Sequence, residues 1–354
     1  MPDQVPDPAP TRVAVVGAGA FGRNHLRVYR ELQLAGSPVE LAAVVDRDHA
    51  TAASAAAQYA IPAFESVEAL LAANLPLDAA SVCVPTLHHL AAARPLLAAG
   101  LDLLVEKPLA ASLDDADEII ALAAENNCLV QAGHLERFNP AVTAARDLLN
   151  RPMFFESHRL SVFTPRSLDV DVVLDLMIHD LDIVLSLVDS PVHEVRAVGL
   201  PVLSSTVDIA NVRLEFADGC VANFTASRVS TERVRKLRFF QPHQYLSLDF
   251  ARQDLLLIDV SAAAGLSQAE LLALIDKRSR PELPGEPRHP TAGMNLSKIK
   301  VAPGEPLRLE LEAFLRAVRT GTAPVVDALA GRRALALALQ INAAIAAHSV
   351  RAGL

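Results

Sequence analysis

Short apolar runs alternate with longer segments of helical character through the first part of the chain. Each run of β-branched and other apolar residues has the length of a buried strand; these runs lie at 12–16, 39–45, 79–84, 101–105 and 129–132. Helices are predicted between them, from a glycine-rich turn to about residue 34 and at 51–60, 88–99 and 114–127. Alternating strands and helices predict an α/β fold with a doubly wound parallel sheet.

The pattern changes after about residue 150, where strand-like segments follow one another directly. Segments 213–216 and 221–227 flank Asp218-Gly219, a dipeptide typical of a tight hairpin turn. A second pair of strands is predicted at 235–240 and 245–250, and closing helices are predicted at 309–319 and 332–348. Consecutive strands indicate an α+β domain with a predominantly antiparallel sheet.

These two patterns predict the domain organisation. Residues 1–10 are expected to be a flexible tail, 11–132 the doubly wound domain and 133–354 the α+β domain. A chain of 354 residues is long enough for two hydrophobic cores. The segment 277–293 is rich in proline and charge and is predicted to be a mobile loop, either a lid over the substrate or only a disordered loop.

Composition narrows the possible partners. A formal net charge of −9 argues against a general electrostatic grip on nucleic acid or an anionic membrane. The three cysteines, Cys83, Cys128 and Cys220, are far apart and show no CxxC spacing, which predicts reduced thiols in the cytoplasm and no zinc site. The start of the chain lacks the pattern of a signal peptide, and no apolar run has the length of a membrane span.

The glycine-rich turn has the pattern GxGxxG and follows the first predicted strand. Gly17 would allow the tight turn, Gly19 would let the backbone approach a pyrophosphate, and Gly22 would let the helix pack on the strand. Ala20 and Phe21 complete the motif, and the helix that follows presents free N–H groups to phosphate. The turn is therefore a candidate dinucleotide-binding loop.

Two charged residues end the second strand. Asp46 stands where a carboxylate usually binds a ribose hydroxyl, and it favours NAD over NADP because it would repel a 2′-phosphate. Arg47 beside Asp46 has two interpretations. Its guanidinium contacts the 2′-phosphate, so that NADP can bind as well, or it is a solvated surface charge.

A second motif, Glu106-Lys107-Pro108, follows the strand at 101–105. Ligands of doubly wound sheets bind beyond the carboxyl ends of strands, where a lysine can donate to a substrate oxygen or move a proton. Pro108 can fix an unusual turn, with a cis bond as one option. The alternative is an exposed lysine before a turn proline.

The third motif places Asp175, His179 and Asp182 about one helical turn apart. A carboxylate beside an imidazole fixes its tautomer and suits it to act as a general base. A solvated polar stripe is the plain alternative. A metal site needs more converging ligands than this one helix offers, so none is predicted.

These motifs, in this order, resemble the glucose–fructose oxidoreductase, inositol dehydrogenase and rhizopine catabolism family (Gfo/Idh/MocA). Further points of resemblance are the sequence Pro85-Thr86-Leu87-His88 after a strand and the stretch 311–340, with Phe314, Gly321, Pro324 and Gly331. The resemblance implies a Rossmann domain followed by an open, mostly antiparallel sheet. It also implies hydride transfer between a sugar carbon and a nicotinamide, and a homodimer or homotetramer formed through the second domain.

The family motif also implies roles for individual residues. Lys107 would bind and polarise the reacting oxygen, His179 would be a general acid or base, and Asp175 would support both. Pro85, His88, Glu106 and Lys107 itself would also contact the cofactor. Either Lys107 or His179 would remove the hydroxyl proton.

Two segments resemble a narrower group, the UDP-N-acetylglucosamine 3-dehydrogenases of lipid A diaminosugar synthesis. One is 134–140, HLERFNP, which would place Arg137 and Asn139 near the substrate; the other is the basic segment 235–241 with 245–249. The basic segment would face a pyrophosphate, or it is the exposed face of an edge strand.

Three functions follow as hypotheses. The first is NAD-dependent oxidation of the 3-hydroxyl of UDP-N-acetylglucosamine, and the second is oxidation of a free polyol or sugar such as an inositol. The third is a non-catalytic NAD(P)-binding regulator, which the presence of Lys107, Asp175 and His179 disfavours.

Overall fold

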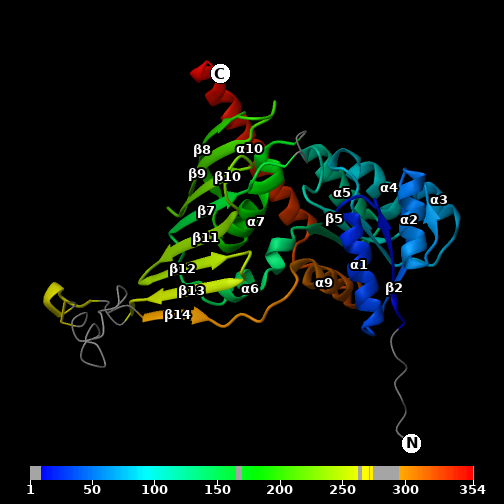
Figure 1. Cartoon of the computed structure of the whole chain (residues 1–354), viewed down its shortest axis with the longest axis horizontal. Helices are drawn as coiled ribbons and strands as arrows, with labels where there is room; N and C mark the ends of the chain where they lie inside the picture. Colours follow the sequence, from blue (N-terminus) through cyan, green and yellow to red (C-terminus); the bar gives the residue numbers. More distant parts are fainter. Residues whose placement is uncertain (1–8, 165–169, 262–264, 271, 274–294, 354) are drawn as a thin grey trace, which may run out of the picture. The chain divides into compact units, whose positions relative to one another are not determined.

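The structure is a computed structural model that describes residues 9–164, 170–261, 265–270, 272–273 and 295–353. It divides into two compact units, the first formed by Met1–Phe138 and Gly304–Leu337, the second by Asn139–Pro303 and Ala338–Leu354 (Figure 1). The predicted loop at 277–293 and residues 1–8 of the predicted tail lie outside the described residues.

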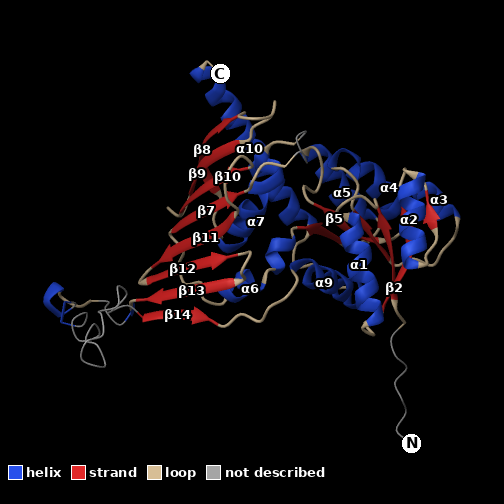
Figure 2. Cartoon of the chain, viewed as in Figure 1, coloured by secondary structure: helices blue, strands red, loops and turns tan. Residues whose placement is uncertain are grey.

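The first unit is built on a six-stranded parallel sheet (Figure 2). Its strands are β1 (Thr11–Val16), β2 (Val39–Val45), β3 (Ala63–Phe64), β4 (Ala79–Val82), β5 (Asp102–Glu106) and β6 (Val130–Gly133), in the order β3-β2-β1-β4-β5-β6. All pairs are parallel, so the predicted doubly wound sheet is confirmed. The order reverses between β1 and β4, and ligands of such sheets bind at that point.

Capping side chains fix where several helices of this unit begin. Asp48, Ser66 and Ser112 each accept a hydrogen bond from a backbone N–H in the first turn of the helix that follows, which is α2 (His49–Tyr59), α3 (Val67–Ala72) and α5 (Leu113–Glu125) respectively. The helices of the unit are α1 (Gly22–Leu34), α2 (His49–Tyr59), α3 (Val67–Ala72), α4 (His89–Ala98), α5 (Leu113–Glu125) and α9 (Pro306–Thr320).

Helix α9 belongs to the first unit although it follows the second sheet in sequence. Its buried residues Leu311, Phe314 and Leu315 lie in the same core cluster as Val15 and Leu26 of the Rossmann half. The sequence pattern places everything from residue 133 onward in the second domain, because local periodicity does not reveal which core an apolar stripe covers. Burial of this stripe is what returns the chain to the first unit.

Helix α10 (Ala328–Ala352) starts in the first unit and ends in the second. Gly331 is required at its start, since a Cβ there would lie 2.6 Å from the Cβ of Ala132. Of the described helices, α10 is the one whose length and hydropathy alone would also suit a membrane span. Its Ala334 and Leu335 are buried in the protein.

The second unit is an eight-stranded sheet with helices on one face. Its strands are β7 (Phe154–Leu160), β8 (Val192–Leu200), β9 (Ile209–Phe216), β10 (Val221–Ser227), β11 (Val234–Gln241), β12 (Gln244–Asp249), β13 (Asp254–Asp259) and β14 (Asn295–Ile299), in the order β14-β13-β12-β11-β7-β10-β9-β8. Every neighbouring pair is antiparallel except β7 with β10. The predicted, mainly antiparallel α+β domain is therefore confirmed.

Helices α6 (Pro140–Arg146) and α7 (Ile178–Leu187) lie on the same side of this sheet (Figure 1). Alternate residues of β7 face them: Phe155, Ser157 and Arg159 are buried, whereas their neighbours are only partly covered. The sheet thus has a helix face, with the core, and an outer face that no described helix covers.

Candidate active site

The glycine turn is shaped by backbone packing at two positions and by open space at the third. Gly17 has φ +95°, and a Cβ there would lie 2.8 Å from the Cys83 carbonyl; a Cβ on Gly22 would lie 1.8 Å from the Gly17 oxygen. At Gly19 a Cβ would meet no atom within 4 Å. Gly17 and Gly22 therefore let β1, β4 and α1 meet, and Gly19 leaves the turn open to a ligand.

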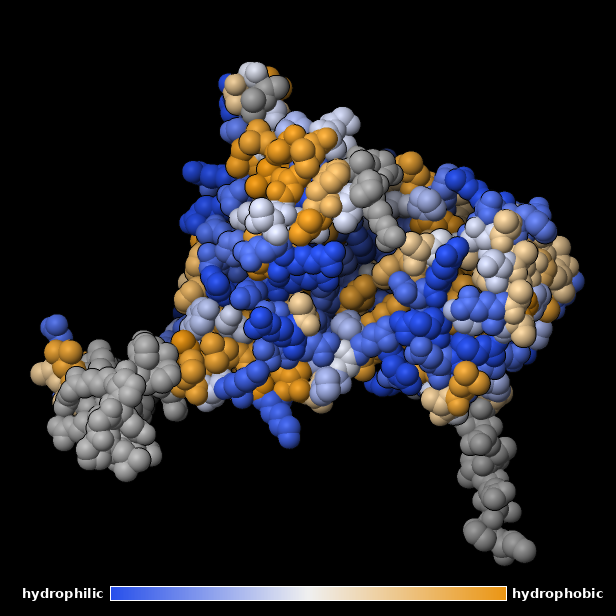
Figure 3. All heavy atoms as spheres, in the orientation of Figure 1, coloured by the Kyte–Doolittle hydropathy of each residue, from blue (hydrophilic) through white to orange (hydrophobic). Residues whose placement is uncertain are grey.

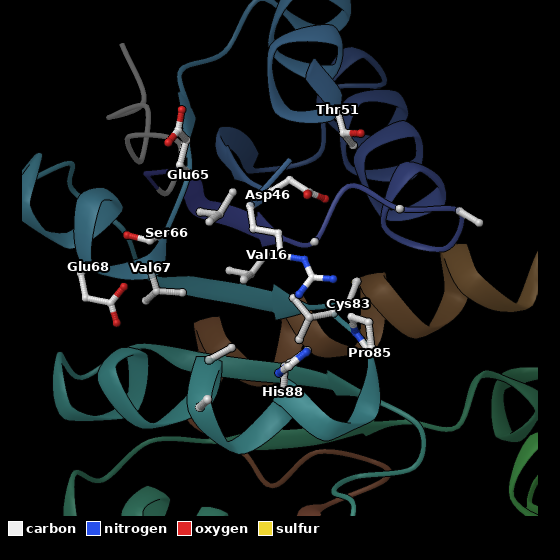
Figure 4. A pocket seen from close by; sticks show the side chains of 18 residues that line it. Val16, Asp46, Thr51, Glu65, Ser66, Val67, Glu68, Cys83, Pro85 and His88 are labelled. Atoms are coloured by element: carbon white, nitrogen blue, oxygen red, sulfur yellow. The ribbon is translucent and has the colours of Figure 1, made fainter. Parts of the chain in front are cut away.

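A cavity of about 750 Å³ opens at this turn, beyond the carboxyl ends of β1, β2 and β4. Figure 4 shows it between Asp46 at the end of β2 and the segment with Pro85 and His88 after β4. Of the residues predicted to bind the cofactor, those that line the cavity are Gly17, Gly19, Ala20, Asp46, Arg47, Pro85 and His88. Its size and its position at the reversal of strand order suit a dinucleotide.

Sequence reasoning missed one wall of this cavity. Thr51 of α2 and the segment from Glu65 to Glu68 also line it (Figure 4). The missed segment joins the two-residue strand β3 to the short helix α3, and neither is long enough to show a period. The N-cap Ser66 before an apolar run was the signal that could have revealed α3.

Asp46 connects the end of β2 to the glycine turn. Its Oδ2 accepts the N–H of Ala18 at 2.7 Å, and its Oδ1 accepts the N–H of Asp48 at 2.9 Å. A carboxylate has about four acceptor positions, so it can still accept a hydroxyl from a ribose. Arg47 is exposed at the same cavity.

Glu106 and Lys107 lie at the carboxyl end of β5. The Lys107–Pro108 peptide is cis, the option that the proline suggested. Glu106 is buried; its Oε2 accepts the backbone N–H of Lys107 at 3.3 Å, and its Oε1 lies 3.0 Å from Nε2 of His25 on α1. Sequence reasoning missed His25, whose only signal was its place on the buried stripe of α1.

His89, rather than its predicted neighbour His88, is the buried imidazole of this region. Its Nε2 lies 2.9 Å from the oxygen of Val84 and its Nδ1 lies 3.3 Å from the oxygen of Leu109. Burial lowers the pKa of His89, although both carbonyls act in the opposite direction. The ring thus lies between the loop after β4 and the loop after β5, within hydrogen-bond distance of one carbonyl oxygen from each, while His88 is exposed at the cavity.

Asp175 and His179 lie at the start of the helix that the sequence predicts. Asp175 is in a π-helical turn, Val173–Met177, which continues directly into α7, and His179 is in the first turn of α7. Both are half-buried, so their polar groups lie at the edge of a core that contains Ile178 and Leu181. Such π-turns occur frequently at functional sites.

A buried ion pair fixes α7 on the sheet. The guanidinium of Arg159 on β7 binds both carboxylate oxygens of Asp180, at 2.9 and 2.6 Å, and it lies 5.2 Å from the centre of the Phe250 ring. Asp180 follows His179 directly, so this bidentate pair sets the position of the turn that carries the imidazole. Sequence reasoning missed the pair because it missed β7.

The segment HLERFNP spans the boundary between the two units. Arg137 is half-buried in a 3-10 turn, Leu135–Phe138, of the first unit. Asn139 begins the second unit and is 1% exposed; its Oδ1 caps α6 through the N–H of Ala141, and its Nδ2 donates to the oxygen of Phe250. The amide of Asn139 thus has a structural use.

The basic segment of β11 is divided between the two faces of the sheet. Arg235 pairs in register with the inward Arg159, whereas Lys236 and Arg238 point to the outer face, where Arg238 binds Glu156 at 3.0 Å. Because β11 lies between β7 and β12, the edge-strand interpretation of this segment is wrong. Arg235 is the one residue of the three on the helix face.

Among the residues that the structure describes, no group of three or more His, Cys, Asp or Glu side chains is arranged to hold a metal ion.

Two family models match the chain. One, described as an oxidoreductase family with an NAD-binding Rossmann fold, matches residues 11–134, and the Gfo/Idh/MocA C-terminal domain matches residues 149–241. The first match contains Asp46 and Lys107, and the second contains Asp175 and His179. The prediction of NAD as cofactor is thereby confirmed.

Individual proteins extend these matches. UDP-N-acetylglucosamine 3-dehydrogenase of Acidithiobacillus ferrooxidans is 36% identical over 341 residues, 96% of this chain and 99% of that protein. A solved structure of that enzyme has a TM-score of 0.81 over 95% of this chain and 97% of its own. Inositol 2-dehydrogenase of Leifsonia xyli subsp. xyli is 31% identical over 195 residues, 52% of this chain and 56% of that protein.

A solved oxidoreductase from Agrobacterium radiobacter, in complex with NAD+, L-tartaric acid and magnesium, is similar in fold alone. It is 16% identical with a TM-score of 0.75, over 95% of this chain and 96% of its own.

Replacing Asp46 tests whether it reads the ribose. Asp46→Ala removes a charged acceptor, so we expect NADH to bind about 10- to 100-fold more weakly and the preference over NADPH to shrink. Fluorescence titration with each nucleotide measures both effects. Asp48→Ala is the matched control, because Asp48 caps α2 and does not line the cavity. An unchanged NADH to NADPH ratio in Asp46→Ala would contradict the assignment.

Proposed function

The chain belongs to the Gfo/Idh/MocA family of NAD-dependent oxidoreductases, and we propose that it oxidises the 3-hydroxyl of UDP-N-acetylglucosamine to a ketone. The observation that supports this substrate is the extent of the match. The UDP-N-acetylglucosamine 3-dehydrogenase of Acidithiobacillus ferrooxidans matches this chain over 99% of its own length. The inositol dehydrogenase relatives match this chain over only about half of their own length. A match through both units covers the residues that we assign to the substrate as well as those that we assign to the cofactor.

The proposed reaction moves a hydride from the sugar carbon to the cofactor and a proton from the hydroxyl group to a side chain. The glycine turn and Asp46 would hold NAD, which would supply the acceptor for the hydride of the carbon that carries the hydroxyl. When His179 is the base, the ammonium group of Lys107 donates to the reacting oxygen and stabilises the negative charge that develops on it; when Lys107 is the base, its neutral amine takes the hydroxyl proton and becomes that ammonium group. The hydroxyl proton passes to the amine of Lys107 or to the imidazole of His179, and Asp175 orients that imidazole.

The surrounding contacts suit these roles. Lys107 follows Glu106, whose carboxylate accepts the N–H of Lys107, and His179 lies in the turn that the Arg159–Asp180 pair holds to the sheet. Rigid elements place reacting groups more precisely than loops do.

The nucleotide part of the substrate needs cationic groups. Arg235 supports the proposal because it lies on the helix face of the sheet, on the same face as Arg159. A guanidinium binds phosphate oxygens in a bidentate way. We assign Arg137 and Arg235 to this task, with Asn139 supporting the substrate segment through its cap of α6.

Oxidation of a free polyol such as an inositol is the second candidate. The inositol dehydrogenase relatives favour it, since the Leifsonia xyli subsp. xyli enzyme is 31% identical over 195 residues. Under the first proposal the enzyme acts in the cytoplasm, in the synthesis of the diaminosugar of lipid A.

We also propose that the outer face of the second sheet joins copies of this chain into a homodimer or homotetramer. Phe154, Phe240 and Tyr245 form a row of rings across three strands, with centroids 5.4 and 4.9 Å apart. At the β8–β9 end, Arg196 pairs in register with Arg213, and Glu194 with Glu215. Rows of opposite sign on one face are self-complementary under two-fold symmetry. Figure 3 shows hydrophobic side chains surfacing among hydrophilic ones at the β12–β14 end.

The substrate is tested by NADH absorbance with NAD and a panel of UDP-hexoses, UDP-hexosamines, inositol and glucose. A trap for the keto-sugar, or a partner aminotransferase, should be present because the ketone is disfavoured at equilibrium. We expect NADH only with UDP-N-acetylglucosamine. Turnover of inositol without any UDP-sugar would replace the first proposal by the second.

Lys107→Ala is expected to lower kcat by about 10²- to 10⁴-fold, the usual contribution of a general acid or base. NADH affinity should stay within about twofold, because Lys107 does not line the cavity that the structure describes. Lys300→Ala, at an exposed loop position, is the control. To identify the base, the activity of Lys107→Ala is measured with added methylamine, and that of His179→Ala with added imidazole. The variant whose activity is restored marks the side chain that removes the proton. Full activity of Lys107→Ala would remove it from the mechanism.

Phe240→Asp tests the proposed interface. Phe240 is 39% exposed in the middle of the aromatic row, so a carboxylate there should separate the subunits to 37.7 kDa. Light scattering after gel filtration measures the mass. Leu34→Asp makes the same change at a residue of the first unit that is 78% exposed, and it should leave the assembly intact. A wild-type monomer would refute the interface.

A further inference from the structure

His25 and Glu106 form a buried polar contact between α1, which follows the glycine turn, and β5, which ends at Lys107. Nε2 of His25 lies 3.0 Å from Oε1 of Glu106, although the residues are 81 positions apart. The side chain of His25 is fully buried, and Glu106 is 7% exposed. A buried carboxylate needs a donor, and the imidazole supplies one from Nε2–H whether the ring is neutral or charged.

Neighbouring groups leave this pair little freedom to turn. The His25 ring packs edge-on against the rings of Phe21 and Tyr29, at centroid distances of 5.5 and 6.4 Å. On the other side, Gly133 of β6 lies against Glu106: a Cβ on Gly133 would be 2.9 Å from the carboxylate. The carboxylate is therefore confined between β6 and the imidazole.

The same carboxylate also contacts the backbone of Lys107. Its Oε2 accepts the N–H of Lys107 at 3.3 Å, while Oε1 faces His25. The imidazole of α1 and the peptide of Lys107 are thus joined through one carboxylate. Without the imidazole, one oxygen would be buried with no donor from α1, and rotation toward another donor would break the contact with Lys107.

We infer that His25 is a positioning residue for Lys107, acting through Glu106. It fixes the carboxylate, the carboxylate fixes the peptide of Lys107, and the peptide sets where the lysine side chain starts. A displacement of about 1 Å at a reacting group costs about 100-fold in rate, so a remote contact of this kind affects turnover. The inference rests on the proposed role of Lys107 but not on which sugar is oxidised.

Three variants separate positioning from packing. His25→Leu removes the donor and keeps an apolar side chain, so we expect kcat to fall about 10- to 100-fold while KM for NAD stays within about threefold. His25→Gln offers an amide N–H near the place of Nε2 and should keep kcat within about threefold of wild type. Tyr29→Phe is the control: it removes a buried hydrogen bond to Ser81 from the same helix and should leave kcat unchanged. Full activity of His25→Leu, or equal losses in the Leu and Gln variants, would overturn the inference.

A second readout needs no substrate and no turnover. The chain has five lysines, so ¹⁵N-lysine labelling gives a simple spectrum in which the Lys107 amide is assigned by its loss in Lys107→Arg. We expect this amide resonance to move in His25→Leu and to stay near its wild-type position in His25→Gln. An unmoved amide in a folded His25→Leu protein overturns the inference. If that variant does not fold, a displaced amide in His25→Gln overturns it, and an unmoved one supports it.

With these two measurements, the role of His25 is tested separately from the proposed function. A wild-type protein that oxidises no UDP-sugar would refute the proposed substrate, and the amide spectra would still decide the role of His25.

Discussion

Close backbone packing at the glycine turn is the constraint on which the first unit depends. The N–H of Gly17 donates to the oxygen of Val45, and the N–H of Cys83 donates to the oxygen of Val16, so three strand ends meet at this turn. No side chain fits at Gly17 or Gly22 without moving main chain. Where backbones pack this closely, the helix that follows must begin at the sheet, and its free N–H groups point to the place where Gly19 leaves room for phosphate.

Polar groups buried in each unit hold the elements that carry the proposed chemistry. In the first unit Glu106 contacts His25, and His89 lies between two loops, near a carbonyl oxygen of each. In the second unit Arg159 binds Asp180 beside His179. Burying charges gains little stability, and breaking one partner is costly. Such pairs are better explained by the fixed geometry that they give to neighbouring residues than by their contribution to the free energy of folding.

The local sequence pattern predicts much of the fold but fewer of the residues in the candidate site. Strand β2 and helix α1 were predictable because each has a clear apolar run or stripe, whereas β3, with two residues, has no period to detect. The glycine turn, Asp46 and Lys107 could be predicted since they are consecutive or end predicted strands. His25 and Arg159 could not, because their roles depend on partners far away in sequence, and the placement of α9 in the first unit depends on a core that only the folded chain forms.

The same difference explains why chemistry is easier to infer than substrate. The proposed chemistry uses a lysine, an imidazole and a dinucleotide cavity, and each is encoded in a short motif with a local physical reason. Recognition of a sugar nucleotide depends on single side chains from separate strands and turns. The basic segment of β11 illustrates this, because alternation sends Lys236 and Arg238 to the outer face and only Arg235 to the helix face. A charged run in the sequence therefore provides one candidate for phosphate binding, and the pairing of strands decides which residue that is.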